Sequence, residues 1–156
     1  MSRKKIRWEP GDVFVVPLSN GEVSVGQALG QSMPNSVRIA LYDEKFKVDE
    51  VPSIDLLCIE NKLISLIEVT KEQLTYGVWK IIGSKAVQIP LQRQPNEQFR
   101  NARWAGASFS DAGLAEDFLN AFHALRPWDN WYDPKYLDNY LVDLSKKPDE
   151  VIYVKN

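Results

Sequence analysis

The run DVFVVPLSNGEVSVGQAL, residues 12–29, carries two β-rich segments on either side of Asn20-Gly21. An Asn-Gly pair favours a two-residue hairpin turn, because both central residues of a type I′ turn take positive φ. In the returning segment Val23 and Val25 alternate with polar neighbours, as in a strand with one face in the core. Gly26 indicates a bulge or a close approach of the backbone. The run therefore predicts an antiparallel hairpin.

Further strands are predicted on the C-terminal side of this hairpin. Residues 37–42 alternate in the same way and predict a third strand of a meander. Two apolar runs, residues 56–60 and 63–69, predict a second hairpin, and residues 78–83 predict another strand. Residues 99–104 are predicted to form one more.

Three helices are expected. Thr70 and Gln73 have the spacing of a capping box, which predicts a short helix that ends at Gly77. The clearest helix is predicted to start at Asp111 and to end near Arg126, because a proline follows. Its apolar stripe consists of Leu114, Phe118, Phe122 and Leu125.

The remaining helix is predicted from Asp133-Pro134, an N-cap followed by proline at the first helical position. Leu137, Tyr140, Leu141 and Leu144 form its stripe. His123 lies opposite the stripe of the preceding helix, so it is expected to face solvent.

These elements predict an α+β fold with a single domain over residues 1–156. The strand-rich part covers residues 11–104 and the helix-rich part covers residues 110–145. We expect a twisted, mainly antiparallel sheet with an SH3-like N-terminal meander and two C-terminal helices packed on it.

Composition limits the function. The formal net charge of −2 gives no strong field for nucleic acid or an anionic membrane. No segment has the length and apolar content of a membrane span, and residues 9–12 interrupt the basic start before any signal-peptide core. Cys58 is the only cysteine and is expected to be a buried residue of a strand. Together these features predict a cytoplasmic protein.

The search for catalytic chemistry is mostly negative. The only histidine is His123, and the sequence contains no Gly-x-Ser-x-Gly motif whose serine it could activate in a catalytic triad. The chain lacks the ligands of a structural zinc site and the lysine of a phosphate-binding loop, so we predict no catalytic residue, metal or cofactor. A pair of carboxylates acting as a small enzyme remains an alternative. Arg100, Arg103 and Trp104 suggest nucleic-acid binding when taken alone, but the acidic balance elsewhere argues against a broad basic face.

Residues 127–137, PWDNWYDPKYL, are the richest candidate for partner contact. Rings with polar edges supply rigid contact area at low entropic cost. Three residues of this segment are assigned mainly structural roles: Asp133 as a helix N-cap, and Trp128 and Tyr136 as hydrophobic residues packed between two helices. The candidate binding residues come from the remainder of this segment and from one acidic helix face. That helix face has the alternative of being an ordinary solvated exterior. The candidates are Asp111, Glu116, Asp117, Asp129, Asn130, Trp131 and Tyr132.

Three passages of the chain resemble the immunity protein 26 family, which is found beside bacterial polymorphic and contact-dependent inhibition toxins. They are residues 11–18 with Gly21 and Gly26, residues 77–83, and residues 127–129 followed by residues 133–138. The resemblance implies a non-enzymatic cytoplasmic protein that neutralises one cognate toxin domain in a 1:1 complex. It does not transfer a binding surface, because toxin-facing residues differ between members of such families.

The sequence therefore leads to three hypotheses. The first is an immunity protein that blocks the active site or the substrate approach of a toxin domain, possibly a nuclease, without binding nucleic acid or membrane itself. The second is an SH3-like module that binds several proteins or peptides. The third is the small carboxylate enzyme.

Overall fold

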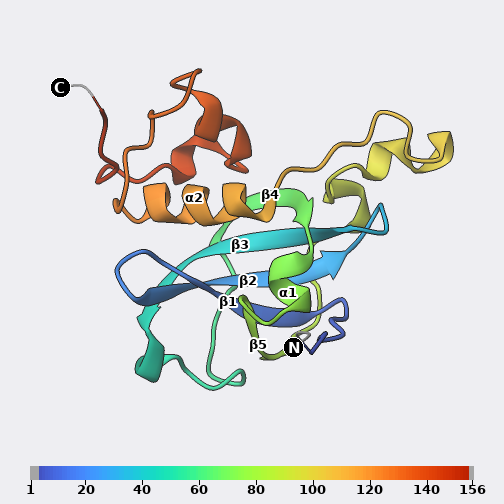
Figure 1. Cartoon of the computed structure of the whole chain (residues 1–156), viewed down its shortest axis with the longest axis horizontal. Coiled ribbons are helices and arrows are strands. Elements are labelled where there is room, and N and C mark those ends of the chain that lie inside the picture. Colours follow the sequence, from blue (N-terminus) through green and yellow to red (C-terminus); the bar gives the residue numbers. More distant parts are fainter. Residues whose placement is uncertain (1–3, 155–156) are drawn as a thin grey trace.

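The computed structural model describes residues 4–154, in which an antiparallel sheet carries one long helix across a face (Figure 1). The strand order is β4-β3-β2-β1-β5, and β4 and β5 form the two edges of this open sheet. The strands are β1 (Asp12–Pro17), β2 (Glu22–Gly30), β3 (Ser36–Lys47), β4 (Leu63–Thr70) and β5 (Lys80–Ser84). The predicted α+β class with a mainly antiparallel sheet is confirmed.

The first hairpin forms as predicted, but its turn differs. Pro17 pairs with Val23, and the Leu18 amide donates to the Glu22 carbonyl at 2.8 Å, which leaves a three-residue connection. Among these connecting residues only Gly21 takes positive φ, at 90°. This geometry suits a turn completed by a left-handed glycine, so the predicted type I′ turn is wrong.

Gly26 marks a close approach, as the sequence indicated. A Cβ atom at this position would lie 2.6 Å from Cζ of Phe14 on the neighbouring strand. The Phe14 ring in turn stacks on Trp79, with centroids 5.2 Å apart and planes 4° from parallel. Glycine therefore leaves the space that this aromatic pair fills in the core.

The helices are α1 (Glu72–Thr75) and α2 (Ala112–Phe122), with five 3-10 turns among the described residues. The predicted start of α2 is confirmed within one residue, and Asp111 is its N-cap, because its Oδ1 accepts a hydrogen bond from the Gly113 amide at 2.8 Å. The helix ends at Phe122, before Arg126, because Ala124 takes a left-handed conformation with φ 61°. The 3-10 turns are η1 (Val48–Glu50), η2 (Leu91–Arg93), η3 (Glu97–Ala102), η4 (Tyr136–Tyr140) and η5 (Leu144–Lys146).

The predicted second C-terminal helix is absent. Only η4 and η5 form there, and the amide of Val142 between them donates to the Ile64 carbonyl of β4 at 2.9 Å. This bond to the sheet edge replaces an intrahelical one, so the helical turn cannot continue through Val142. Asp133 caps a turn instead of a helix, accepting from the Lys135 amide at 2.9 Å.

Three shorter predictions are also wrong. Residues 56–60 form no strand, because β4 follows β3 in the sheet and pairs directly with it. Cys58 consequently lies in a loop and is exposed. The Thr70 hydroxyl accepts from the Ala112 amide at 2.9 Å instead of capping α1, whose N-cap is Lys71. Residues 99–104 lie largely in η3 and not in a strand.

Both faces of the sheet are covered. The helix α2 packs over the larger core, whose fully buried members include Phe118 and Trp128. A smaller core on the opposite face gathers Val13, Val25 and Tyr42 under the loop that contains Leu57. Burial there raises the pKa of Tyr42 to about 12. Among residues 4–154 no helix has the length and hydropathy needed to cross a bilayer.

Candidate functional site

A groove of about 470 Å³ lies beside the first turns of α2 and unites three of the seven predicted binding residues. One wall is the N-terminal part of the helix. The other is the segment of residues 127–137, which we call the aromatic connection. The lining residues are Ser110, Asp111, Gly113, Leu114, Asp117, Trp131 and Tyr136. Asp111, Asp117 and Trp131 thus meet although up to twenty residues separate them in the chain.

The negative charge on the acidic side of the groove is partly neutralised by an arginine. The Arg126 guanidinium pairs with Asp117 at 2.7 Å and also lies over the Trp131 ring, 5.6 Å from its centroid. Arg126 therefore ties the helix to the aromatic connection. Asp111 is the other acidic residue of the groove, and it is exposed. Its carboxylate accepts a hydrogen bond from the Gly113 amide but forms no ion pair within residues 4–154.

Stacked rings form the other wall. Trp131 and Tyr136 lie with centroids 4.8 Å apart, and Tyr136 meets Tyr140 at 5.2 Å. The Tyr140 hydroxyl donates to the Tyr136 hydroxyl at 3.0 Å, a bond that together with burial raises the pKa of Tyr136 to about 12. Nε1 of Trp131 is buried and has no hydrogen-bond partner among the described residues. The wall is thus rigid and largely apolar.

The rest of the connection divides between structural and exposed residues. Tyr132 is the most exposed of the large hydrophobic side chains described, with 106% relative accessibility, and Asn130 is exposed beside it. Asp129 has an internal role, since its Oδ1 accepts from the Val154 amide at 2.7 Å. Trp128 is fully buried and donates to Oδ1 of Asp138 at 2.8 Å, as its predicted structural role requires.

Glu116 does not line the groove. One carboxylate oxygen accepts hydrogen bonds from Gln73 at 2.9 Å and from Nε1 of Trp79 at 3.1 Å. These bonds connect α2 to α1 and to the residue that precedes β5. Glu116 therefore contributes to packing at a place removed from the other candidates.

His123 is half-buried, so the expectation that it faces solvent is wrong. Its Nε2 lies 3.4 Å from the Ser24 hydroxyl, because the end of α2 rests on the sheet at this point. Burial, with the nearby positive charge of Lys45, lowers the pKa of His123 to about 4. The imidazole is therefore neutral at pH 7.

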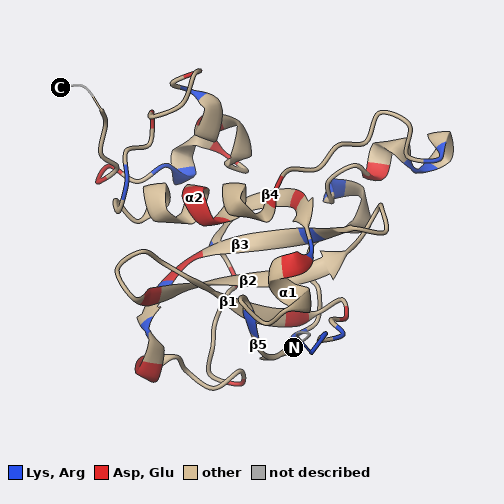
Figure 2. Cartoon of the chain, in the orientation of Figure 1, with Lys and Arg blue, Asp and Glu red and all other residues tan. Residues whose placement is uncertain are grey.

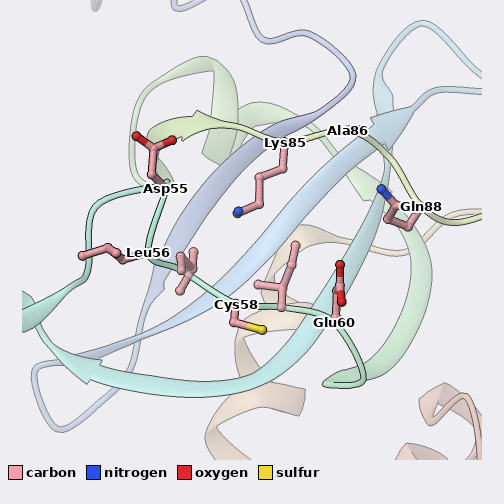
Figure 3. Close-up of a pocket in the computed structure, with 9 residues that line it drawn as sticks. Asp55, Leu56, Cys58, Glu60, Lys85, Ala86 and Gln88 are labelled. Atoms are coloured by element: carbon pink, nitrogen blue, oxygen red, sulfur yellow. The ribbon is translucent and has the colours of Figure 1, made fainter.

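Another pocket, of about 400 Å³, lies between residues 55–60 and residues 85–88 (Figure 3). Cys58 and Glu60 border it from the first segment and Lys85 from the second. None of the predicted binding residues is near it. Within residues 4–154 no three His, Cys, Asp or Glu side chains are grouped so that they could hold a metal ion.

A buried polar cluster was missed in the sequence. Glu68, with a fully buried side chain, accepts hydrogen bonds from the backbone and hydroxyl of Ser32, from Ser36 and from Asn96. Arg38 is its partner in the strand register, with Nε 3.9 Å away. Burial alone raises the pKa of Glu68, but the hydrogen bonds outweigh it and the net pKa is lowered.

Single charges of opposite sign inside two apolar strands were the available signal for this cluster. Arg38 stands in SVRIALY and Glu68 in LISLIEV. A lone charge in an otherwise buried strand requires a buried partner. Ser32 and Asn96 come from outside the strands and Ser36 is the first residue of β3, and no local pattern marks any of them.

A protein-family model described as Immunity protein 26 matches residues 9–112, about two thirds of the chain. Searches of the curated proteins and of the solved structures found no match. The matched segment contains the whole sheet and ends at the start of α2. It includes Asp111 but not Asp117 or the aromatic connection, so most of the groove lies outside the region that the family model describes.

Proposed function

Because the chain belongs to the immunity protein 26 family, we propose that it binds one cognate bacterial toxin domain and neutralises it. The toxin would belong to a contact-dependent inhibition or other polymorphic system. Neutralisation would follow from covering the active site or the approach of the substrate, without any reaction carried out by this chain. The family match is the observation that carries this proposal.

The geometry supports a particular surface for the contact. The groove beside α2, with Asp111, Asp117 and Trp131, continues into the exposed Asn130 and Tyr132. A rigid aromatic wall loses little conformational entropy on binding. The acidic rim would speed association with a basic toxin domain such as a nuclease. Glu116 and Asp129 would act indirectly, by holding this surface in place.

Co-expression with the toxin domain tests the proposal. Cells that produce both proteins are expected to grow, and the two proteins are expected to co-purify as a 1:1 complex from the cytoplasm. Binding should weaken as the salt concentration rises, because charged rims are screened over about 8–10 Å at physiological ionic strength. Continued growth arrest, together with no co-purification, would overturn the proposal.

Substitution of exposed residues tests the surface. Tyr132→Ala is expected to weaken toxin binding at least about tenfold without changing stability, because the side chain makes no buried contact. Leu56→Ala is the matched control, since Leu56 is also exposed but lies near the distant pocket. Equal affinities for the two variants would remove this surface from the proposal.

The same experiments separate the alternatives. A peptide-binding module on an SH3-like meander would capture many peptides weakly and would give no protection against a toxin. A carboxylate enzyme would show turnover that disappears when one Asp or Glu is neutralised while folding is retained. Either result would replace the immunity proposal.

A further inference from the structure

Residues 95–108, which we call the arm, stand out from the body of the protein beside the N-terminal end of α2 (Figure 1). The turn η3 lies mainly in the first half of the arm, and the majority of the arm's residues are exposed. The arm contributes little to the hydrophobic core, since neither core cluster includes any of its side chains. A protruding loop with so little core contact needs another reason for a defined shape.

Asn96 holds the two ends of the arm together. Its Nδ2 donates to the Ser108 carbonyl at 2.7 Å, and its Oδ1 accepts from the Ser108 amide at 3.1 Å. The same Nδ2 donates to Oε1 of the buried Glu68 at 2.6 Å. The arm is thus a closed loop whose base is anchored in the polar cluster of the sheet.

The backbone of the arm is held in unfavourable conformations. Asn96, Arg103 and Trp104 have φ of 67°, 54° and 68°. Positive φ is tolerated by asparagine but is costly for a bulky aromatic residue. Strain of this kind persists where the surroundings impose it, and it concentrates at functional sites.

Arginine side chains surround the one tryptophan of the arm. Two guanidinium groups contact the Trp104 ring, that of the buried Arg38 of β3 at 5.4 Å and that of Arg100 at 5.0 Å from its centroid. Glu97 accepts two hydrogen bonds from Arg100, at 2.6 Å and 3.0 Å, and a third charged contact from Arg38 at 3.1 Å. The hydrogen bond from Arg100 is the leading cause that lowers the pKa of Glu97.

Arg103 differs from these residues because it is exposed and forms no ion pair within residues 4–154. Two arginines against one glutamate make the arm basic, on a chain whose net charge is −2 (Figure 2). Arginine binds carboxylates through two parallel hydrogen bonds, and arginine and tryptophan are over-represented among residues that dominate binding energy. The arm therefore offers an exposed guanidinium without an ion-pair partner among the described residues, on the residue that precedes Trp104 in the chain.

We propose that the arm enters an acidic cleft of the cognate toxin domain and that Arg103 pairs there with a carboxylate. The inference rests on the proposed function and adds a second contact of opposite charge to the acidic groove. Asp111 follows the arm by three residues, so both contacts lie at the same end of α2. Two neighbouring contacts of opposite sign fix the orientation of the partner, because a rotated complex would bring like charges together.

The test uses the full chain and the toxin domain that it neutralises in the co-expression experiment. Arg103→Glu is expected to weaken binding at least about tenfold at low salt, mainly through slower association. Lys47→Glu is the matched control, since it makes the same charge change at an exposed end of β3 and should alter affinity less than about twofold. Equal effects of the two variants would overturn the inference while leaving the proposed function intact.

Arg103→Gly distinguishes contact from structural support. Glycine accepts the positive φ at this position, so the melting temperature should stay the same or rise while toxin affinity falls at least about tenfold. A residue needed only for folding would give a lower melting temperature and unchanged affinity in the folded fraction, which would contradict the inference. Absence of toxin binding by the wild-type protein would overturn the proposed function and the inference together.

Nucleic acid is the other partner that arginine and tryptophan could bind. A fluorescently labelled single-stranded oligonucleotide, titrated with the wild-type protein and with the Arg103→Glu variant, tests this outcome. No binding by either protein is expected. Binding by the wild type that the substitution abolishes would assign the arm to nucleic acid and overturn the inference.

Discussion

Glu68→Gln would remove one charge from the centre of the polar cluster and keep the size of the side chain. The Glu68 carboxylate faces only donors: the Ser32 amide at 2.8 Å, the Ser32 hydroxyl at 2.7 Å and Asn96 at 2.6 Å, with the Ser36 hydroxyl also bonded. An amide can accept at one end only, so its nitrogen would point at a donor in either orientation. The variant therefore loses hydrogen bonds that no rotation restores.

The magnitude follows from the chemistry of the bonds. A hydrogen bond to a charged group contributes about 1.5–3 kcal/mol, and breaking a buried ion pair costs about 3–5 kcal/mol. Arg38 retains its contact with Glu97 at 3.1 Å, so the lower part of this range applies. We expect the free energy of unfolding to fall by about 3 kcal/mol. For a chain of this size that corresponds to a melting temperature lower by about 6–12 °C.

Chemical denaturation at neutral pH measures the loss, and limited trypsin digestion reports on the arm. Cleavage after Arg100 or Arg103 should accelerate, because the anchor of Asn96 is weakened. Glu60→Gln is the matched control, since Glu60 is exposed and should change stability by no more than about 0.5 kcal/mol. A loss below about 1 kcal/mol for Glu68→Gln would refute the view that the charge organises this cluster.

The pH dependence gives an independent check. The pKa of Glu68 is lowered in the folded state, so its contribution is fully present above the ordinary carboxyl pKa of 4.5. It is lost as the pH falls through the folded-state value. The wild type should therefore lose more stability than the Glu68→Gln variant in this acidic window, and parallel curves would contradict the assignment.

Three further predictions concern packing and titration. His123→Gln should flatten the fall in stability between pH 6.5 and pH 4. The folded-state pKa of about 4 lies below the ordinary value of 6.5, so the unfolded chain binds the proton first as the pH falls. Urea titrations of both proteins across this range measure the difference in stability. Trp128→Ala should cost about 3–5 kcal/mol in the same unfolding assay, whereas Tyr132→Ala should stay within about 0.5 kcal/mol, and similar losses would contradict the division of the aromatic connection. Gly26→Ala should destabilise by about 1–3 kcal/mol, since the added methyl would overlap the Phe14 ring, and a neutral result would show that the ring can move.

Local sequence patterns were sufficient to predict several strands and the main helix. The first hairpin, the third strand and the start of α2 next to Asp111 all formed where alternation or an apolar helical stripe predicted them. The second C-terminal helix failed although its stripe was regular, because the Val142 amide pairs with the sheet edge. Competition between a helical turn and a distant strand leaves no trace in a local window.

The candidate site was predictable in part for the same reason. Residue type selected Asp117 and Trp131, but only the packing of α2 against the aromatic connection brings them into one groove. Glu116 looked equivalent to Asp117 on the helix, yet its carboxylate binds Trp79 and lies elsewhere. The shape of the arm was not predicted, and residues 99–104 within it were expected to form a strand, because the bonds between Asn96, Ser108 and Glu68 join residues that are far apart in sequence.

The position of the polar cluster explains why a charged pair occupies the sheet at all. Apolar residues of similar volume often stabilise a core as well as a buried ion pair or better, so Arg38 and Glu68 are not needed for the sheet itself. The hydrogen bonds of Glu68 are directional and reach the segment that contains Asn96, and Arg38 forms an ion pair with the neighbouring Glu97. A hydrophobic contact could cover the base of the arm but could not fix the angle at which it leaves the protein. The cluster thus supplies orientation, which is the property that a projecting arginine needs if it is to meet one carboxylate on one partner.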